Sequence, residues 1–523
     1  MNAQKCQKPV GVSVLCGNTD YIHSPKAVSD ILQGKTIENP SEKPEIWQNL
    51  QKYCQKGIKT LFFRSLLNYE GASSSALSQG TWYLASSLKK NGMEYLFSDA
   101  KLTPDGKDFF GREELAQLLS HDRDIVYAVI PLTEFYIEGA KRLCRFIRHY
   151  APDCVIAMGG IMPTRHPYHV MAHFDDVGLI IRGDGDKALP AAINAISSGD
   201  IRSFETLKGV MYRNGGIFIA ANPEYVNREK DLDSLFLDFS MLEKRDIFGG
   251  GYFYVSRGCR NACNFCVSYS RGNPRFISYK KALEWFGAYH DRACSIYDGK
   301  VPLSALNIGF YDDDFFADRQ AGLDIINAAA RSGLKVSFVQ TAIRSFLKNG
   351  RVDQDFVYSL NPEYFSESCL DGDMHPNLFI GTENFCDDEL EVLGKGYGIC
   401  EVNAVSEALS RQGITQRHHL ILSNVFTTER HIKSNIAAIY NLRKRFPKHF
   451  YLLQSITPAL YSFFGTASYS RAEKAGLLDY ARHDTLRIRN FPEFDYPVAI
   501  GDIPADRNAA KILPAAMEAI RRL

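Results

Sequence analysis

The stretch Ser256-Arg257-Gly258-Cys259-Arg260-Asn261-Ala262-Cys263-Asn264-Phe265-Cys266 places three cysteines four and three residues apart. Three thiolates can hold three irons of a [4Fe–4S] cube and leave the fourth iron open for a small chelating ligand. A structural zinc site is the alternative, but it needs four ligands, usually from two cysteine pairs. No second pair and no nearby histidine completes this one. The stretch therefore favours an iron–sulfur cluster with one open iron.

The composition of the 523 residues limits the classes of function. The 61 basic and 60 acidic side chains balance, so charge gives no indication of a nucleic acid partner. No apolar run approaches the roughly 18 residues that span a bilayer, and the N-terminus has no signal-peptide core. The cysteines outside the opening stretch are scattered singly, as in a reducing compartment. We expect a cytoplasmic protein with no membrane span.

Residues 57–201 alternate strand and helix patterns. The predicted strands are 60–64, 95–97, 124–130, 155–158 and 177–181, with helices at 79–91, 136–150 and 188–196. This alternation favours α/β architecture, namely a Rossmann-like parallel sheet with its ligand crevice at the carboxyl ends of the strands. The loops there contain Thr133, Glu134, Gly159, Gly160, Gly183, Asp184 and Gly185. The glycines either let the backbone approach a bulky ligand or simply form tight turns.

Residues 249–460 resume the alternation after a linker at 202–248, which carries a hairpin signal at Asn214-Gly215-Gly216. The predicted strands are 252–256, 305–310, 335–340, 378–380, 418–423 and 451–456. Six strands with intervening helices fit a partial (β/α)6 barrel of TIM type, whose chemistry lies at the carboxyl ends of the strands. Residues 1–56 are interpreted as an N-terminal extension. Residues 461–523 are interpreted as a C-terminal cap with a short strand near 498–500 and a final helix at 509–523.

The spacing Cys259-x3-Cys263-x-Phe265-Cys266 resembles the signature of the radical S-adenosylmethionine (SAM) superfamily. The parallel α/β domain in front of it resembles the cobalamin-binding branch of that superfamily, which includes the class B methyltransferases. Further segments similar to that branch occur in order, over about residues 57–475: Val155–Gly160, Gly183–Asp186, Phe310–Phe315, Ile380–Asn384, Leu393–Gly396, and Thr457-Pro458 with Gly465-Thr466.

The resemblance implies three cofactors. Cys259, Cys263 and Cys266 would hold a [4Fe–4S] cluster, and SAM would chelate its open iron. Asp312 or Asp313 would accept a hydrogen bond from the SAM ammonium, Glu383 would bind the ribose, and Arg344 is a candidate for the SAM carboxylate. Phe265 and Gln340 complete the SAM set. The loop residues named above at the strand ends of the domain 57–201 would contact cobalamin. The D-x-H-x-x-G motif of many cobalamin proteins is absent from that domain.

The activity implied by the resemblance is that of a cobalamin-dependent methyltransferase acting on an unactivated carbon, through a 5′-deoxyadenosyl radical and methylcobalamin. Its substrate would be a small molecule of lipid or natural-product type, and an external flavodoxin- or ferredoxin-type donor would supply electrons. One alternative is a radical SAM cyclase, isomerase or oxidative ring-forming enzyme that transfers no methyl group. Another is an enzyme whose front domain serves only to bind substrate or a partner. His418 and His419 lie on a predicted strand, one face of which is interpreted as packed.

Overall fold

The computed structural model describes residues 58–66, 76–122, 124–133, 136–214, 217–220, 228, 231–268, 272, 274–366, 369–370, 373–374, 378–452, 460, 462–463, 465–477 and 504–521. The chain divides into two compact units. The first comprises Met1–Glu229 with Leu235–Asp238, and the second comprises Lys230–Ser234 with Phe239–Leu523. The predicted extension at 1–56, the strand near 498–500 and the Thr457-Pro458 segment lie outside the described residues.

The first unit contains a seven-stranded sheet in the order β2-β1-β5-β6-β7-β8-β9. Its five parallel strands are β1 (Lys59–Phe63), β2 (Glu94–Ser98), β5 (Ile125–Pro131), β6 (Val155–Gly159) and β7 (Val177–Ile181). The antiparallel strands β8 (Val210–Asn214) and β9 (Ile217–Ala220) extend the sheet. This is the hairpin that the sequence placed in a linker. It joins the sheet because residues 210–212 pair with residues 179–181 of β7.

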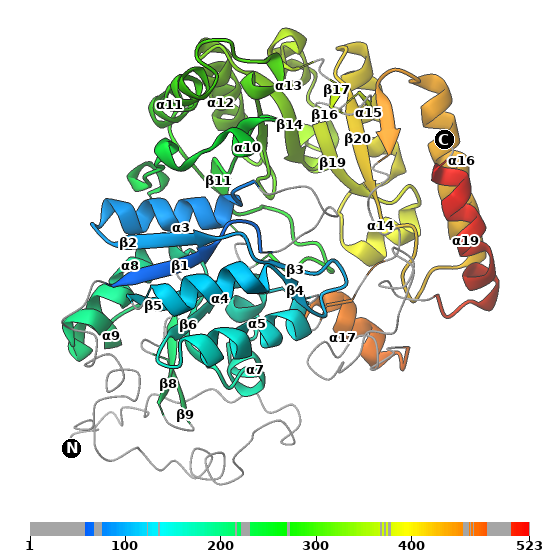
Figure 1. Ribbon diagram of the computed structural model, residues 1–523. Helices are drawn as coiled ribbons and strands as arrows, with labels where there is room; N and C mark the ends of the chain where they lie inside the picture. The colour runs from blue at the N-terminus through cyan, green and yellow to red at the C-terminus, as the bar shows by residue number, and fades with distance from the viewer. Residues whose placement is uncertain are drawn as a thin grey trace, which may run out of the picture. The chain divides into compact units, whose positions relative to one another are not determined.

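Helices cover both faces of this sheet. In Figure 1, α3 (Gln79–Lys90) lies on one side of β1 and β2, and α4 (Arg112–His121) and α5 (Ile137–Tyr150) lie on the other. Helix α8 (Gly185–Ser198) packs against α3. The unit also contains β3 (Lys101–Leu102), β4 (Phe109–Phe110), α6 (Ile161–Arg165), α7 (Pro167–His173) and α9 (Ile201–Glu205). These elements confirm the predicted α/β class.

The second unit contains six parallel strands that neighbour one another in chain order. They are β10 (Gly251–Phe253), β13 (Asn307–Phe310), β14 (Lys335–Thr341), β19 (Leu378–Glu383), β20 (Gln416–Leu420) and β21 (Phe450–Leu452). The helices between them are α11 (Tyr279–Ile296), α12 (Arg319–Arg331), α13 (Gln354–Ser359), α14 (Asp387–Leu393), α15 (Ile399–Arg411) and α16 (Glu429–Arg445). This sequential order is the one a (β/α)6 arrangement requires, and no pairing joins β10 to β21 within the described ranges.

Local capping explains where several of these helices begin. Ser278, Asp318 and Asp353 each accept a hydrogen bond from the backbone N–H three residues ahead, at the starts of α11, α12 and α13. Glycine in the left-handed conformation follows α14, where Gly394 has a φ of 71°. Such signals are short-range, so the sequence reveals them without knowledge of the fold.

The predicted strand 252–256 is divided in the structure. Strand β10 ends at Phe253, and Ser256-Arg257 form a separate strand, β11, antiparallel to β12 (Arg275–Phe276). The cause is Asp312, whose carboxylate accepts hydrogen bonds from both the backbone N–H and the hydroxyl of Ser256. The chain therefore leaves the sheet just before the cysteine loop.

The C-terminal part contains α17 (Ala467–Lys474) and α19 (Arg507–Arg521), the latter matching the predicted final helix. Helix α19 lies beside α16 in Figure 1. Asp506, which precedes α19, accepts a hydrogen bond of 3.2 Å from the backbone N–H of Glu429 at the start of α16. Among the helices that the structure describes, none is long and apolar enough to cross a membrane.

Candidate active site

The cysteine loop follows β11 at the carboxyl edge of the six-stranded sheet. Cys259, Cys263 and Cys266 are thiols rather than disulfides in the described chain. The backbone N–H and the side-chain amide of Asn261 each lie 3.4 Å from Cys259 Sγ, and the backbone N–H of Ser268 lies 3.3 Å from Cys266 Sγ. Hydrogen bonds from N–H groups to cysteine sulfurs are characteristic of iron–sulfur sites, where they tune the potential. The donor set therefore fits a cluster held by three cysteines.

Asp314 connects this loop to the next strands. Its carboxylate is 2% exposed. It accepts hydrogen bonds from Asn261 Nδ2 at 3.2 Å, from Thr341 Oγ1 at 2.9 Å and from Ser345 Oγ at 2.9 Å. The sequence drew attention to Asp312 and Asp313 and passed over Asp314. Its role in positioning the loop depends on contacts with residues far away in the chain, which no local signal reveals.

Asp312 and Asp313 were left as alternatives by the sequence, and their surroundings differ. Asp312 is 1% exposed, and one of its oxygens accepts the hydroxyl of Ser256 at 2.6 Å. Its other oxygen, Oδ2, is buried and has no hydrogen-bond partner among the described residues. Burial raises the pKa of Asp312 to about 7, against the lowering effect of Ser256. A buried oxygen without a donor suits a cationic ligand such as an ammonium.

Asp313 presents a different environment from Asp312. It is exposed, and it accepts a hydrogen bond of 2.9 Å from Ser268 Oγ in the cysteine loop. Asp313 therefore fastens the end of the loop, while the buried Oδ2 of Asp312 remains the better acceptor for a ligand.

Glu383 ends β19 with a left-handed backbone, at φ 71°. Such a conformation costs a non-glycine residue about 1–3 kcal/mol and is concentrated at functional sites. Its Oε2 lies 2.6 Å from His419 Nδ1, and its Oε1 lies 3.5 Å from Lys395 Nζ. Burial raises the pKa of Glu383, but His419 and Lys395 outweigh it and lower the pKa to about 2. We call these three residues the Glu383 cluster.

Lys395 brings a buried positive charge next to the cysteine loop. Its ammonium lies 5.7 Å from the ring centroid of Phe265, the residue before Cys266, and 5.8 Å from that of Tyr397. Burial lowers the pKa of Lys395, but Tyr397 and Glu383 raise it further, so the amine stays protonated. Lys395 lies in one of the segments that resemble the cobalamin-binding branch, but the sequence predicts no role for it or for Tyr397.

His418 and His419 have opposite environments, because successive residues of a strand point to opposite faces. His418 is fully buried, bonded to Thr382 Oγ1 at 2.6 Å and to Gln416 Oε1 at 2.8 Å. Burial lowers the pKa of His418 to about 3, so it is neutral. The interpretation as a packed residue is confirmed for His418. His419 lies on the other face of the strand, where it contacts Glu383.

Two glycines allow the segment after α14 to approach the cysteine loop and Arg344. A Cβ on Gly394 would lie 2.8 Å from the side chain of Asn264, and one on Gly396 would lie 2.2 Å from Arg344 Nη2. Arg344 is exposed, with Nη2 3.5 Å from the carbonyl oxygen of Gly396. Gln340 is exposed as well, and its backbone carbonyl accepts the N–H of Phe315 at 2.9 Å.

Buried polar side chains also follow the strands of the first unit, among them Arg64 after β1 and Arg182 after β7. Thr133, after β5, is 9% exposed, and its Oγ1 is buried without a hydrogen-bond partner among the described residues. Gly160 and Gly183 adopt φ values of 98° and 82°, which explains glycine at both positions. A Cβ on Gly185 would lie 2.9 Å from Leu84 of α3, so this glycine serves helix packing.

The other residues predicted to line this crevice differ. Gly159 has room, since a Cβ there would lie 3.6 Å from the carbonyl oxygen of Ile181, an ordinary contact distance. Asp184 is 2% exposed and stands at the N-terminus of α8. Glu134 lies outside the described residues. The unsatisfied hydroxyl of Thr133 and the open position at Gly159 fit a bound ligand, whereas the other glycines are explained by the chain itself.

Comparison with known proteins gives the following. No family model matches the chain. A stretch of 128 residues is 27% identical to the anaerobic magnesium-protoporphyrin IX monomethyl ester cyclase of Synechocystis, covering 24% of this chain and 25% of that protein. The structure resembles that of OxsB, a cobalamin-dependent SAM radical enzyme, with a TM-score of 0.59, 15% identity, and coverage of 81% of this chain and 62% of OxsB.

The match to a second solved structure covers a larger share of that protein's chain than the match to OxsB does. The radical SAM methyltransferase TsrM from Kitasatospora setae matches with a TM-score of 0.55 and 14% identity, over 76% of this chain and 75% of TsrM. This chain has the fold of the cobalamin-dependent radical SAM enzymes. The resemblance first inferred from the cysteine motif is thereby confirmed at the level of the fold. This chain spans about a quarter of the cyclase that it matches and under two thirds of OxsB.

Proposed function

We propose that this protein is a cobalamin-dependent radical SAM methyltransferase that acts on an unactivated carbon of a small lipid-like or natural-product substrate. The observation that carries the proposal is the loop of Cys259, Cys263 and Cys266, with N–H donors directed at its sulfurs, in this fold. OxsB and TsrM, which share the fold, are a cobalamin-dependent SAM radical enzyme and a radical SAM methyltransferase with cobalamin and a [4Fe–4S] cluster bound.

The residues of the second unit would hold SAM through its charged ends. A bound cluster supplies the electron that cleaves SAM, delivered by an external flavodoxin- or ferredoxin-type donor. Asp312 Oδ2 would accept a hydrogen bond from the SAM ammonium. This contact would supply the partner that the buried oxygen lacks among the described residues. The exposed guanidinium of Arg344 would pair with the SAM carboxylate. Phe265 and Gln340 stay in the proposed SAM set as flanking residues.

Glu383 would bind the ribose hydroxyls through its carboxylate. Lys395 and His419 keep that carboxylate ionised, since they lower its pKa to about 2. An ionised carboxylate accepts hydrogen bonds more strongly than a neutral acid, so the Glu383 cluster prepares the acceptor before the ligand arrives. Lys395 and His419 are therefore positioning residues.

The first unit would bind cobalamin at the carboxyl ends of β5, β6 and β7. Thr133 Oγ1 offers an unused hydrogen-bonding group there, and Gly159 leaves space beside Ile181. Gly160, Gly183, Asp184 and Gly185 would shape the loops of this crevice. Glu134, whose place the structure does not describe, remains part of the prediction from the sequence.

A second candidate is a radical SAM cyclase that transfers no methyl group. The similarity of 27% over 128 residues to the protoporphyrin ester cyclase favours it. The two candidates share the cluster and SAM and differ in the fate of the substrate, so products distinguish them.

The test is anaerobic purification followed by assays of iron, sulfide and corrinoid, and then incubation with SAM, reductant and candidate substrates. S-adenosylhomocysteine together with 5′-deoxyadenosine is the result expected for the methyltransferase. 5′-Deoxyadenosine with ring formation and no S-adenosylhomocysteine would support the cyclase. A protein that binds no corrinoid under any loading condition would contradict both the cobalamin assignment and methyl transfer through it.

A further inference from the structure

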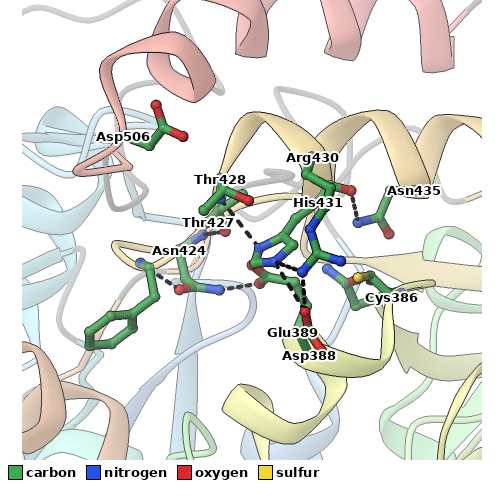
Figure 2. A network of polar contacts seen from close by, with 12 residues as sticks. Cys386, Asp388, Glu389, Asn424, Thr427, Thr428, Arg430, His431, Asn435 and Asp506 are labelled. Atoms are coloured by element: carbon green, nitrogen blue, oxygen red, sulfur yellow. Dashed lines mark hydrogen bonds and ion pairs between the residues drawn. The ribbon is translucent and has the colours of Figure 1, made fainter.

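Three side chains of metal-binding type meet at two helix N-termini, on the turns that follow β19 and β20. Cys386 is the N-cap of α14, Asp388 is the second residue of α14, and His431 is the third residue of α16. One ligand atom from each lies within 4.8 Å of the other two. Around a tetrahedral zinc ion, bonded sulfur, nitrogen and oxygen atoms are about 3.3–3.7 Å apart, so small side-chain rotations would close the set. Figure 2 shows the three residues directed toward one another.

A buried carboxylate orients the histidine of this group. His431 Nδ1 lies 2.7 Å from Glu389 Oε1, and Glu389 is 0% exposed. The other oxygen of Glu389 accepts a hydrogen bond from the amide of Asn424 (Figure 2). The backbone N–H of Thr428 also approaches Nδ1, at the longer distance of 3.3 Å. A carboxylate behind the histidine is the usual arrangement that fixes the ring of a metal ligand.

The opposite ring nitrogen, Nε2, faces Arg430 and Asp388. Arg430 Nη2 lies 3.2 Å from His431 Nε2. Nδ1, in contrast, faces the carboxylate of Glu389 and the backbone N–H of Thr428. Nε2 also lies 3.5 Å from Asp388 Oδ2, which is close to the separation of two ligands on one zinc ion.

Arg430 now supplies the positive charge that this group attracts. Its guanidinium is paired with Asp388, and its side chain is 70% exposed. It can therefore move into solvent at little cost when another cation takes its place. Burial raises the pKa of the Cys386 thiol above its ordinary value, against the lowering effect of the backbone N–H groups of Glu389 and Asp388, so a bound cation would have to displace the thiol proton.

We propose that Cys386, Asp388 and His431 form a binding site for one zinc-type divalent cation, with its fourth position open to solvent. A thiolate and an imidazole select zinc over magnesium or calcium, which prefer oxygen ligands. The bound ion would tie the turn that carries Glu383 to the start of α16. The site uses none of the residues assigned to the cluster, SAM or cobalamin, so it stands or falls independently of the proposed function.

The first test measures zinc in the full-length, cluster-loaded protein after exposure to zinc and a fixed chelator wash. The wild type is expected to retain about one equivalent. Cys386→Ser should lose it, and the matched control Cys400→Ser, an exposed cysteine of α15, should keep it. Glu389→Gln should weaken retention about 10–100-fold. Arg430→Gln should strengthen it, because a competing cation is removed.

The second test uses Co²⁺ as a spectroscopic probe in a variant with Cys259, Cys263 and Cys266 all replaced by Ala, which removes iron–sulfur absorbance. A thiolate-to-cobalt charge-transfer band and tetrahedral visible bands are expected, and both should disappear when Cys386→Ser is added. Zinc retention equal in the wild type and Cys386→Ser, or cobalt bands unaffected by that change, would overturn the proposal. A wild type that carries its full cluster but retains no zinc would also overturn the proposal. Arg430 would then be the cation that permanently balances the charge of Asp388.

Discussion

The carboxyl edges of the two parallel sheets are prepared for ligands in different ways. In the second unit, the strand ends carry buried charges: Asp312 with an unused oxygen, and Glu383 held by Lys395 and His419. In the first unit, the described strand ends carry the buried side chains of Arg64, Arg182 and Asp184, glycines, and Thr133, whose hydroxyl has no hydrogen-bond partner among the described residues. Buried charges are costly unless a partner compensates them. The two edges differ in the group left for a ligand, which is a carboxylate oxygen of Asp312 in the second unit and the hydroxyl of Thr133 beside glycine loops in the first.

The largest expected effect tests the edge with charges at its cysteine loop. Cys263→Ala should lose most of the cluster iron and reduce SAM cleavage to background, because two thiolates hold the cluster poorly. Iron and sulfide analysis with the absorbance of the cluster gives the measurement. Cys400→Ala, at an exposed position, is the control and should match the wild type. Retained cluster absorbance in Cys263→Ala would refute the assignment of this thiol as a ligand.

Removing the buried cation should have the next largest effect. Lys395→Met leaves the ionised Glu383 with one partner fewer, and breaking a buried ion pair costs about 3–5 kcal/mol in free energy of unfolding. Urea denaturation measures it. The double variant Lys395→Met with Glu383→Gln should recover part of the loss.

The matched control for that experiment is Lys433→Met, which breaks the exposed pair between Lys433 and Glu429. Its cost should be below about 1 kcal/mol. If Lys395→Met costs no more than this control, the Glu383 cluster is not the charged, desolvated arrangement described above.

The pH dependence of stability should reveal Asp312. Its pKa is about 7 in the folded protein, above its ordinary value of 3.8. Between these pH values the folded state keeps a proton that the unfolded state releases, so stability falls as pH rises, by up to about 1.4 kcal/mol per pH unit. Asp312→Asn should flatten this slope in urea denaturation measured across the range.

Glu383 affects the pH dependence of stability in the opposite direction to Asp312 and over a lower range of pH. Its lowered pKa contributes stability that is present above its ordinary value of 4.5 and is lost as pH falls toward about 2.

Binding of SAM should release a proton near pH 7 if its ammonium pairs with Asp312, because a nearby cation lowers the pKa of that carboxyl. Calorimetry in buffers of different ionisation enthalpy measures this release. A SAM affinity with the same pH dependence in wild type and Asp312→Asn would contradict that pairing.

The smallest effect is expected at the edge of the first unit. Thr133→Val keeps the shape of the side chain and removes the hydroxyl, so corrinoid affinity should fall about 3–10-fold, equivalent to roughly 1 kcal/mol. SAM affinity is the internal control and should be unchanged. A loss of about 3–5 kcal/mol in the free energy of corrinoid binding would equal the stability cost expected for Lys395→Met. It would show that hydrogen bonding in this crevice is as important as charge in the other. Unchanged corrinoid affinity would leave Thr133 without a part in binding.

Much of this description follows from the sequence alone, where its signals are local. The spacing of Cys259, Cys263 and Cys266 is readable because one loop supplies all the thiols. The strands and helices follow from hydrophobic periodicity and from caps such as Ser278 and Gly394, which act within a few residues. Polar residues at strand ends are likewise visible before the fold is known, because parallel strands bring their carboxyl ends to one edge.

The tertiary structure decided how those residues differ in role. Asp312, Asp313 and Asp314 are adjacent in sequence, and only their distant partners distinguish the unsatisfied acceptor from the two that fasten the cysteine loop. Lys395 reaches Glu383 and the ring of Phe265 only in the folded chain. Hydrogen bonds and ion pairs depend on positions in space rather than in sequence. The same reason explains why the meeting of Cys386 with His431 could not be foreseen.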